Sequence, residues 1–385
     1  MHLGFVFLLL AAYLLVERFL HERRLRRIPV RVHVNGTRGK TSVTRMIAAC
    51  LRRAGVRTLA KTTGGRAVLV LPDGREEEIR RLAPPNVLEQ MKVVRRAASL
   101  GARALVVECM ALDPVLQQLS ERGMIRATVG VITNVRPDHL EVMGPSLDDV
   151  AKALAGTIPE GATLVTGDRR YFLDFSTVAA GRRTRAVLAE APGPGRPGAA
   201  VPGALVENEA IARAVCRELG LDPSDVEAGL AAERGDRATA PLPSLSRGGR
   251  TIHLLDAFGA NDVESTRRLV EDALGRGACP RPLVALFANR SDRPLRMKSF
   301  AAALAGEGLY DLVGVIGDGA RLAFRRFREA VPRERLFRLC GTTADELLGE
   351  LVDVVPARAF TIVGMGNERG AGALLSAAFR GAGAR

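Results

Sequence analysis

A chain of 385 residues is long for one hydrophobic core and predicts two domains of roughly 150–200 residues each. Hydrophobic residues make up 47% and charged residues 25% of the chain, which excludes an extensively disordered protein. The net charge of +14 is compatible with binding of anionic substrates, nucleic acid or an acidic membrane face, and also with an arginine-rich solvated surface. The absence of tryptophan argues against a surface on which nucleic-acid bases stack.

The N-terminus begins with an apolar segment. Leu3–Val16 is unbroken, and Phe19-Leu20 extends it. Four arginines follow at 23–27, the reverse of a secretory signal, and their position predicts that the rest of the chain faces the cytoplasm. We expect a membrane-anchor helix at 1–20 and a basic linker at 21–29. Because the run is short of the roughly 20 residues that span a bilayer, a helix packed on the protein itself is the alternative.

Downstream of this segment, strands and helices alternate. Apolar runs predict strands at Val30–Val34, Ala104–Val107, Thr128–Thr133, Thr163–Thr166, Thr251–Leu255, Leu283–Ala288, Leu312–Ile316 and Ala359–Val363. Between them, Val43–Ala54 has apolar residues at helical spacing. The alternation predicts an α/β fold with parallel sheets covered by helices on both faces.

Two stretches rich in proline and glycine interrupt this pattern. Ala191–Gly203 cannot hold a helix or a central strand and is predicted to be a loop. Arg234–Arg250 separates the two sets of strands, so we place the domain boundary there. The expected domains are a P-loop ATP-binding central domain at 30–240 and a smaller C-terminal α/β domain at 248–385.

The first candidate site is the run Gly36-Thr37-Arg38-Gly39-Lys40-Thr41-Ser42, which joins a predicted strand to a predicted helix. Glycines let the main chain curl so that its N–H groups point at phosphate oxygens, and the helix N-terminus adds positive potential. Lys40 is expected to reach the outer phosphates of ATP, and the Thr41 hydroxyl to bind Mg²⁺. Val34 stands where the strict pattern has its first glycine, so the loop is a variant.

Polar residues also follow two other predicted strands. Glu108 comes directly after Ala104–Val107, where a carboxylate can bind Mg²⁺. Thr133-Asn134-Val135-Arg136-Pro137-Asp138-His139-Leu140 ends the next strand. Each such residue alone is more often a surface charge, a helix cap or a structural histidine. Since the carboxyl ends of parallel strands share one edge of a sheet, together they predict a nucleotide and metal site there.

These motifs resemble those of the Mur ligase superfamily. The resemblance rests on Gly-Thr-x-Gly-Lys-Thr at 36–41, on Glu108 and on Asn-Val-x-x-Asp-His at 134–139. Looser matches lie at Glu207–Ala212, Gly220–Pro223, Leu255–Asp262 and Asn289–Pro294. The resemblance covers the chain from about residue 30 to residue 372.

Within the superfamily, the chain resembles the ligase subunits of poly-γ-glutamate synthases. The shared features are an apolar N-terminal segment in place of a separate substrate domain, together with Lys61–Gly64, Glu108–Ala111, Arg136–His139, Asn289-Arg290, Arg293-Pro294 and Gly364–Asn367. The resemblance implies an amide ligase that activates the γ-carboxylate of glutamate with ATP and Mg²⁺. It also implies attachment to the cell membrane, with a small integral-membrane synthase subunit and an export component as partners.

The resemblance further implies residue roles. The catalytic set is Lys40, Glu108, His139, Arg290 and Arg293. The nucleotide-binding set is Gly36, Thr37, Arg38, Gly39, Lys40, Thr41, Ser42, Asn134, Asp256 and Asn261. The metal set is Thr41, Thr63, Glu108 and His139, for one Mg²⁺ ion or two. The arginines Arg38, Arg290 and Arg293 suit binding of two carboxylate-rich reactants, because guanidinium groups bind carboxylates bidentately.

One departure concerns the second metal. Many Mur ligases hold it with a carboxylated lysine after the Asp-His motif, but no lysine occurs between Lys152 and Lys298.

Three other functions stay open. Another Mur-type ligase, acting on a peptidoglycan precursor or a folate, would share the motifs but not the apolar N-terminus. A membrane-tethered P-loop ATPase would turn over ATP without forming an amide. A nucleic-acid-binding ATPase rests on the net charge alone. Five cysteines without a Cys-x-x-Cys pair indicate neither a disulfide framework nor a zinc site and fit a reducing cytoplasm.

Overall fold

The computed structural model describes residues 2–63, 67–79, 81, 85–191, 203–234, 242–260, 262–306 and 308–382. The chain divides into two compact units, one formed mainly by residues 1–196 with 205–235 and the other mainly by residues 236–385. Most of the loop predicted at Ala191–Gly203 lies outside the described residues, and so do residues 235–241 of the predicted domain boundary.

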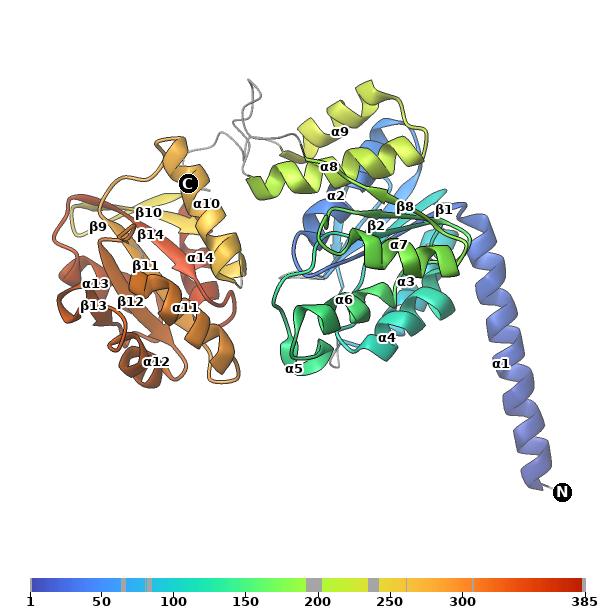
Figure 1. The fold of residues 1–385 in the computed structure, drawn as a ribbon, viewed down its shortest axis with the longest axis horizontal. Helices are drawn as coiled ribbons and strands as arrows, with labels where there is room; N and C mark the ends of the chain where they lie inside the picture. Colours follow the sequence, from blue (N-terminus) through green and yellow to red (C-terminus); the bar gives the residue numbers. More distant parts are fainter. Residues whose placement is uncertain are drawn as a thin grey trace. The chain divides into compact units, whose positions relative to one another are not determined.

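The first unit, coloured from blue to yellow-green in Figure 1, contains an eight-stranded sheet in the order β4-β3-β2-β5-β1-β6-β7-β8. Its strands are β1 Val30–Asn35, β2 Thr58–Thr62, β3 Val68–Val70, β4 Glu76–Glu78, β5 Ala104–Glu108, β6 Val129–Ile132, β7 Thr163–Thr166 and β8 Arg185–Leu188. The strands from β2 to β8 in this order are parallel, and β3 and β4 add an antiparallel edge. The parallel α/β sheet predicted from the sequence is confirmed.

The central strand is β1, which pairs with β5 on one side and β6 on the other. Its side chains alternate between the two faces, so Val32 and Val34 belong to the core on one face. On β5, Leu105 and Val107 belong to the core on the opposite face. Because both faces are covered by helices, β5 is apolar up to Glu108, whereas β1 has a valine at every second position and alternates them with Arg31, His33 and Asn35.

The helices of this unit are α2 Lys40–Arg53, α3 Glu89–Ser99, α4 Pro114–Leu119, α5 Leu140–Met143, α6 Leu147–Ala155, α7 Phe172–Gly181, α8 Gly203–Glu218 and α9 Pro223–Arg234, with a π-helix η1 at Ser120–Ile125. Helix α2 packs on β1 with α8 and α9. A Cβ atom on Gly229 of α9 would lie 2.5 Å from Cys50 Cα of α2, so glycine permits the close contact of these helices.

The N-terminal helix α1 spans His2–Arg27, and its two halves differ. His21 and Leu25 are buried against the first unit, so most of the segment predicted as a linker at 21–29 is helix; that prediction was wrong. From Phe5 to Phe19, the large apolar side chains are 53–72% exposed. Among the described residues, no helix combines the length and the apolar character needed to cross a membrane.

The second unit contains a six-stranded sheet in the order β13-β12-β11-β14-β10-β9. Its strands are β9 Ser244–Arg247, β10 Arg250–Asp256, β11 Leu283–Asn289, β12 Leu312–Gly317, β13 Leu336–Arg338 and β14 Ala359–Met365. Its helices are α10 Val263–Gly275, α11 Pro294–Gly306, α12 Ala320–Phe327, α13 Ala344–Val354 and α14 Ala371–Ala382, with short 3₁₀ turns η3 at Phe258–Ala260 and η4 at Arg333–Arg335. Only β9 is antiparallel, and the four strands predicted here are all present.

The contact between α2 and α9 is testable. Gly229→Ala adds a methyl group against main-chain atoms of Cys50, so we expect a loss of roughly 1–3 kcal/mol in the free energy of unfolding, measured by urea denaturation. The matched control is Gly181→Ala in α7, where no atom lies within 4 Å of the added Cβ. Equal effects of the two substitutions would contradict the close contact.

Candidate active site

The candidate site lies at the carboxyl edge of the first sheet, where β1, β5 and β6 end. Gly36 follows β1 and Gly39 precedes α2, and their φ angles are 126° and 79°. A Cβ atom on Gly36 would overlap the hydroxyl of Thr133, and one on Gly39 would overlap the amide of Asn208. Only glycine fits both positions, because an L side chain is also strained at such φ angles. The run therefore forms the strand–turn–helix expected of a phosphate-binding loop.

Lys40 is the first residue of α2 and its side chain folds back over this loop. Its Nζ donates to the carbonyl of Gly36 at 2.7 Å and lies 3.4 Å from that of Thr37. The ammonium group is therefore held at the loop together with the N-terminus of α2, and both favour an anion. Thr41 and Ser42 follow in the first turn of the helix.

Glu108 connects the loop to the neighbouring strand. It is the last residue of β5 and is 3% exposed. Its Oε2 accepts hydrogen bonds from the Thr41 hydroxyl at 3.0 Å and from the main-chain N–H of Thr63 at 2.7 Å. Three of the four residues predicted to bind metal are thus brought together. A carboxylate and a hydroxyl at this separation are the hard oxygen donors that Mg²⁺ prefers, so the site fits this ion.

His139, the fourth predicted metal ligand, lies elsewhere on the same edge. Its Nδ1 is 3.4 Å from Glu141 Oε1, and its Nε2 is 3.8 Å from Asp138 Oδ1. Within the described part of the chain, no group of three or more His, Cys, Asp or Glu side chains is placed to hold a metal ion.

Asn134 holds the phosphate-binding loop from the end of β6. Its Oδ1 accepts from the Thr37 hydroxyl at 2.7 Å and from the Arg38 N–H at 3.0 Å. Its Nδ2 donates to the Arg38 carbonyl at 3.2 Å, and Thr133 Oγ1 donates to the same carbonyl at 2.6 Å. These contacts give Asn134 a positioning role in the phosphate-binding loop, and its contact with the nucleotide stays a prediction.

The charged residues of the two loops are paired with each other. Arg38 forms an ion pair with Asp138 at 3.2 Å, and both side chains are at most 15% exposed. Arg136 pairs with Glu207 of α8 at 3.0 Å, and its main-chain N–H donates to the Thr37 hydroxyl. These pairs hold α8, the loop at 134–139 and the phosphate-binding loop as one assembly, and the guanidinium of Arg38 is committed to Asp138.

The sequence reasoning gave no role to Lys61, which lies on β2 beneath the site. Its side chain is fully buried, and its Nζ lies 2.8 Å from Glu89 Oε1 and 3.1 Å from Gln90 Oε1. Burial lowers the pKa of Lys61. Burial would by itself raise the pKa of Glu89, but hydrogen bonds from Arg81 and Lys61 outweigh it and hold that pKa at about 2. Gln90 in turn donates to the Glu108 carbonyl at 3.3 Å.

The remaining predicted residues belong to the second unit, at the carboxyl ends of β10 and β11. Arg290 binds Asp292 with two contacts, the shorter at 2.6 Å, and Arg293 lies 3.9 Å from the same carboxylate. Asp256 ends β10 and is 4.0 Å from Arg380. Asn261 lies outside the described residues. Because β14 lies between β10 and β11, these residues share one edge of the second sheet.

Comparison with known proteins covers both units. The Mur ligase middle domain matches residues 34–187, and the poly-gamma-glutamate synthase CapB C-terminal domain matches residues 242–382. The chain is 32% identical to the capsule biosynthesis protein CapB of Bacillus anthracis, over 96% of this chain and 80% of that protein. It is 31% identical to PGA synthase CapB of Bacillus subtilis (strain 168), over 93% of this chain and 92% of that protein.

Among solved structures, the fold is similar to a Mycobacterium tuberculosis folylpolyglutamate synthase complexed with ADP. The TM-score is 0.66 at 19% identity, over 94% of this chain and 93% of that chain. At this identity the similarity establishes the fold.

The role of Asn134 can be tested by Asn134→Ala. The substitution leaves the Thr37 hydroxyl and the Arg38 N–H without their acceptor, so we expect ATP affinity to fall roughly 10- to 100-fold, measured by titration with a fluorescent ATP analogue. Asn86→Ala, at an exposed position, is the control and should bind the analogue as wild type does. Unchanged affinity of Asn134→Ala would refute the positioning role.

Proposed function

Because the chain belongs to the CapB family of poly-γ-glutamate synthases, it is an ATP-dependent amide ligase that polymerises glutamate, and we propose that the carboxyl edge of its first sheet activates the γ-carboxylate. One observation carries this proposal. The Thr41 hydroxyl donates a hydrogen bond to Glu108 beside the phosphate-binding loop, and the side chain of Lys40 folds over the same loop. Hard oxygen donors and a fixed cation are thus gathered at one helix N-terminus.

In the proposed reaction, an oxygen of the γ-carboxylate attacks the terminal phosphorus of ATP, and ADP leaves. The acyl phosphate is then attacked by the amine of a second glutamate, which forms the amide, releases phosphate and loses a proton. Lys40 and the loop N–H groups would stabilise charge on the transferred phosphoryl oxygens. Thr41 and Glu108 would hold Mg²⁺, which neutralises further charge on those oxygens when bound.

The other residues keep narrower roles. Arg290 and Arg293 stay proposed carboxylate-binding residues, and Asp256 a proposed nucleotide contact, at the shared edge of the second sheet. Arg290 would have to exchange its contacts with Asp292 for those with a substrate carboxylate. We propose that one Mg²⁺ ion binds beside Thr41 and Glu108, and a metal-binding role for His139 stays a prediction.

We also propose that α1 attaches the chain to the cytoplasmic face of the cell membrane. The support is the row of apolar side chains from Phe5 to Phe19, which are exposed to 53–72% and followed by arginines. An exposed apolar surface of this kind marks a membrane or partner interface. A small integral-membrane synthase subunit and an export component are the partners that this proposal includes.

The activity can be tested by release of ADP and phosphate from the detergent-extracted full chain, with glutamate present or withheld. We expect turnover that glutamate stimulates and a γ-linked product detectable by mass spectrometry. Lys40→Ala and Glu108→Gln should each lower turnover at least about 100-fold, because each removes a group that stabilises charge on the phosphoryl oxygens.

The matched controls are Lys92→Ala and Glu78→Gln, both at exposed positions, and they should keep wild-type turnover. Release of ADP and phosphate at the same rate with and without glutamate would contradict the proposal. That outcome would leave a ligase for another substrate or an ATPase without ligase activity.

A further inference from the structure

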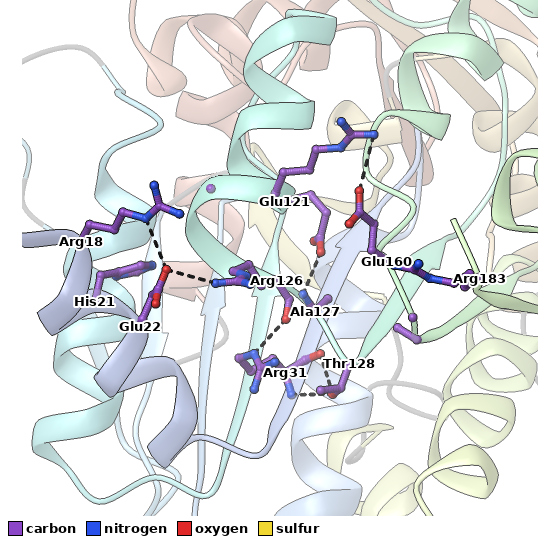
Figure 2. A pocket seen from close by; sticks show the side chains of 14 residues that line it. Arg18, His21, Glu22, Arg31, Glu121, Arg126, Ala127, Thr128, Glu160 and Arg183 are labelled. Atoms are coloured by element: carbon purple, nitrogen blue, oxygen red, sulfur yellow. Dashed lines mark hydrogen bonds and ion pairs between the residues drawn. The ribbon is translucent and has the colours of Figure 1, made fainter. Parts of the chain in front are cut away.

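A cavity of about 790 Å³ lies at the amino edge of the first sheet, opposite the candidate active site (Figure 2). Arg31 near the start of β1, Thr128 just before β6 and Gly161 just before β7 contribute to its walls. The helices α1 and η1 close it from the side. Strand β1 runs from this edge to the phosphate-binding loop, a length of roughly 17–20 Å, so the cavity is a separate site.

The lining of this cavity is predominantly basic. Its charged residues are Arg18, Arg31, Arg122, Arg126, Arg183, Glu22, Glu121 and Glu160, together with His21. The Glu121 carboxylate is paired with buried His33 at 2.7 Å. Five guanidinium groups therefore outnumber the three carboxylates, one of which, Glu121, is already hydrogen-bonded to His33.

The two remaining carboxylates leave part of this charge uncompensated. Glu22 Oε1 lies 3.4 Å from Arg18 and 3.6 Å from Arg126, as the dashed lines in Figure 2 show. Glu160 lies 3.9 Å from Arg122. Within the residues that the structure describes, neither Arg31 nor Arg183 forms an ion pair.

Arg31 gives the cavity a rigid wall. Its guanidinium donates to the carbonyls of Ile28 at 2.7 Å, Ile125 at 3.1 Å and Arg126 at 2.9 Å. Burial lowers the pKa of Arg31, because this cation is poorly solvated. From the other side, the His21 ring lies 2.8 Å from the Met124 carbonyl and joins α1 to η1. The cavity is thus preorganised for an anion by main-chain contacts between secondary-structure elements.

The apolar surface of α1 ends at this cavity. Val16 and Phe19 are 56% and 64% exposed, and Arg18 and Glu22 of the same helix line the cavity. A membrane that covers this apolar surface would bring its headgroups to the level of the cavity. A polyglutamate chain would also supply anions, but it is made at the opposite edge of the sheet and offers nothing to cover Val16 and Phe19.

We propose that this cavity binds the phosphate of an anionic lipid headgroup at the membrane surface. The inference rests on the membrane attachment proposed above for α1. Guanidinium groups bind phosphodiesters bidentately, and arginines beside a membrane-embedded helix select anionic lipids.

The test is co-sedimentation of the full chain with lipid vesicles, either phosphatidylcholine alone or with about one third phosphatidylglycerol. Wild type should bind the anionic vesicles about tenfold more tightly than the neutral ones. The double variant Arg126→Gln and Arg183→Gln should lose most of that preference and keep its binding to neutral vesicles. The control double variant, Arg95→Gln and Arg103→Gln, removes the same charge from exposed positions of the first unit outside both the cavity and α1 and should keep the preference.

Both double variants should keep the glutamate-dependent ADP release of wild type in detergent. This result would show that they are folded and would separate the inference from the ligase activity. Equal loss of lipid preference in the two double variants would mean diffuse attraction and would overturn the inference. In a parallel binding measurement, the cavity variant alone could lose affinity for a labelled γ-glutamate oligomer and keep its preference for anionic lipid. That result would assign the cavity to the polymer and would also overturn the inference. Failure of wild type to bind any vesicle would overturn the membrane attachment together with the inference.

Discussion

The amide of Asn134 is the contact on which the catalytic edge of the first unit depends. A phosphate-binding loop needs main-chain N–H groups that converge on one point, and a glycine-containing turn has too much conformational freedom to hold that geometry alone. Asn134 removes this freedom by bonding the Thr37 hydroxyl and both main-chain groups of Arg38. The loop from the neighbouring strand therefore sets the shape of the phosphate-binding loop, while Glu108, from the strand on the other side, sets the position of Thr41.

The predictable part of the fold was the part whose pattern repeats along the chain. Strands β5 and β11 are apolar runs covered on both faces, and β1 has a valine at every second position, so all three were found to within a residue or two. Strand β2 was missed because Lys61 and two flanking threonines interrupt its apolar pattern. The short strand β8 was missed because it lies at the sheet edge and is only partly buried.

The candidate site was likewise predictable in part: its location could be predicted from the sequence, but the contacts of its side chains could not. Glycine spacing and strand ends located the loop, Glu108 and the run at 134–139, because parallel topology alone brings them to one edge. The function of each side chain could not be predicted, because an amide such as that of Asn134 can face a nucleotide or a main chain with the same sequence. The burial of Lys61 depends on Glu89 and Gln90, which lie nearly thirty residues away along the chain. No local pattern encodes such a contact.

The continuity of α1 has a mechanical consequence. The helix runs without interruption from His2 to Arg27, and Arg31 fixes its last turn by bonding the carbonyls of Leu25 and Ile28. A flexible tether would let an enzyme tumble at the end of its chain, whereas a helix anchored at its base acts as a strut about 39 Å long. Once the apolar part of such a strut is held, the tilt of the first unit relative to the surface that holds it is set. The carboxyl edge of the first sheet would then keep one constant direction relative to that surface.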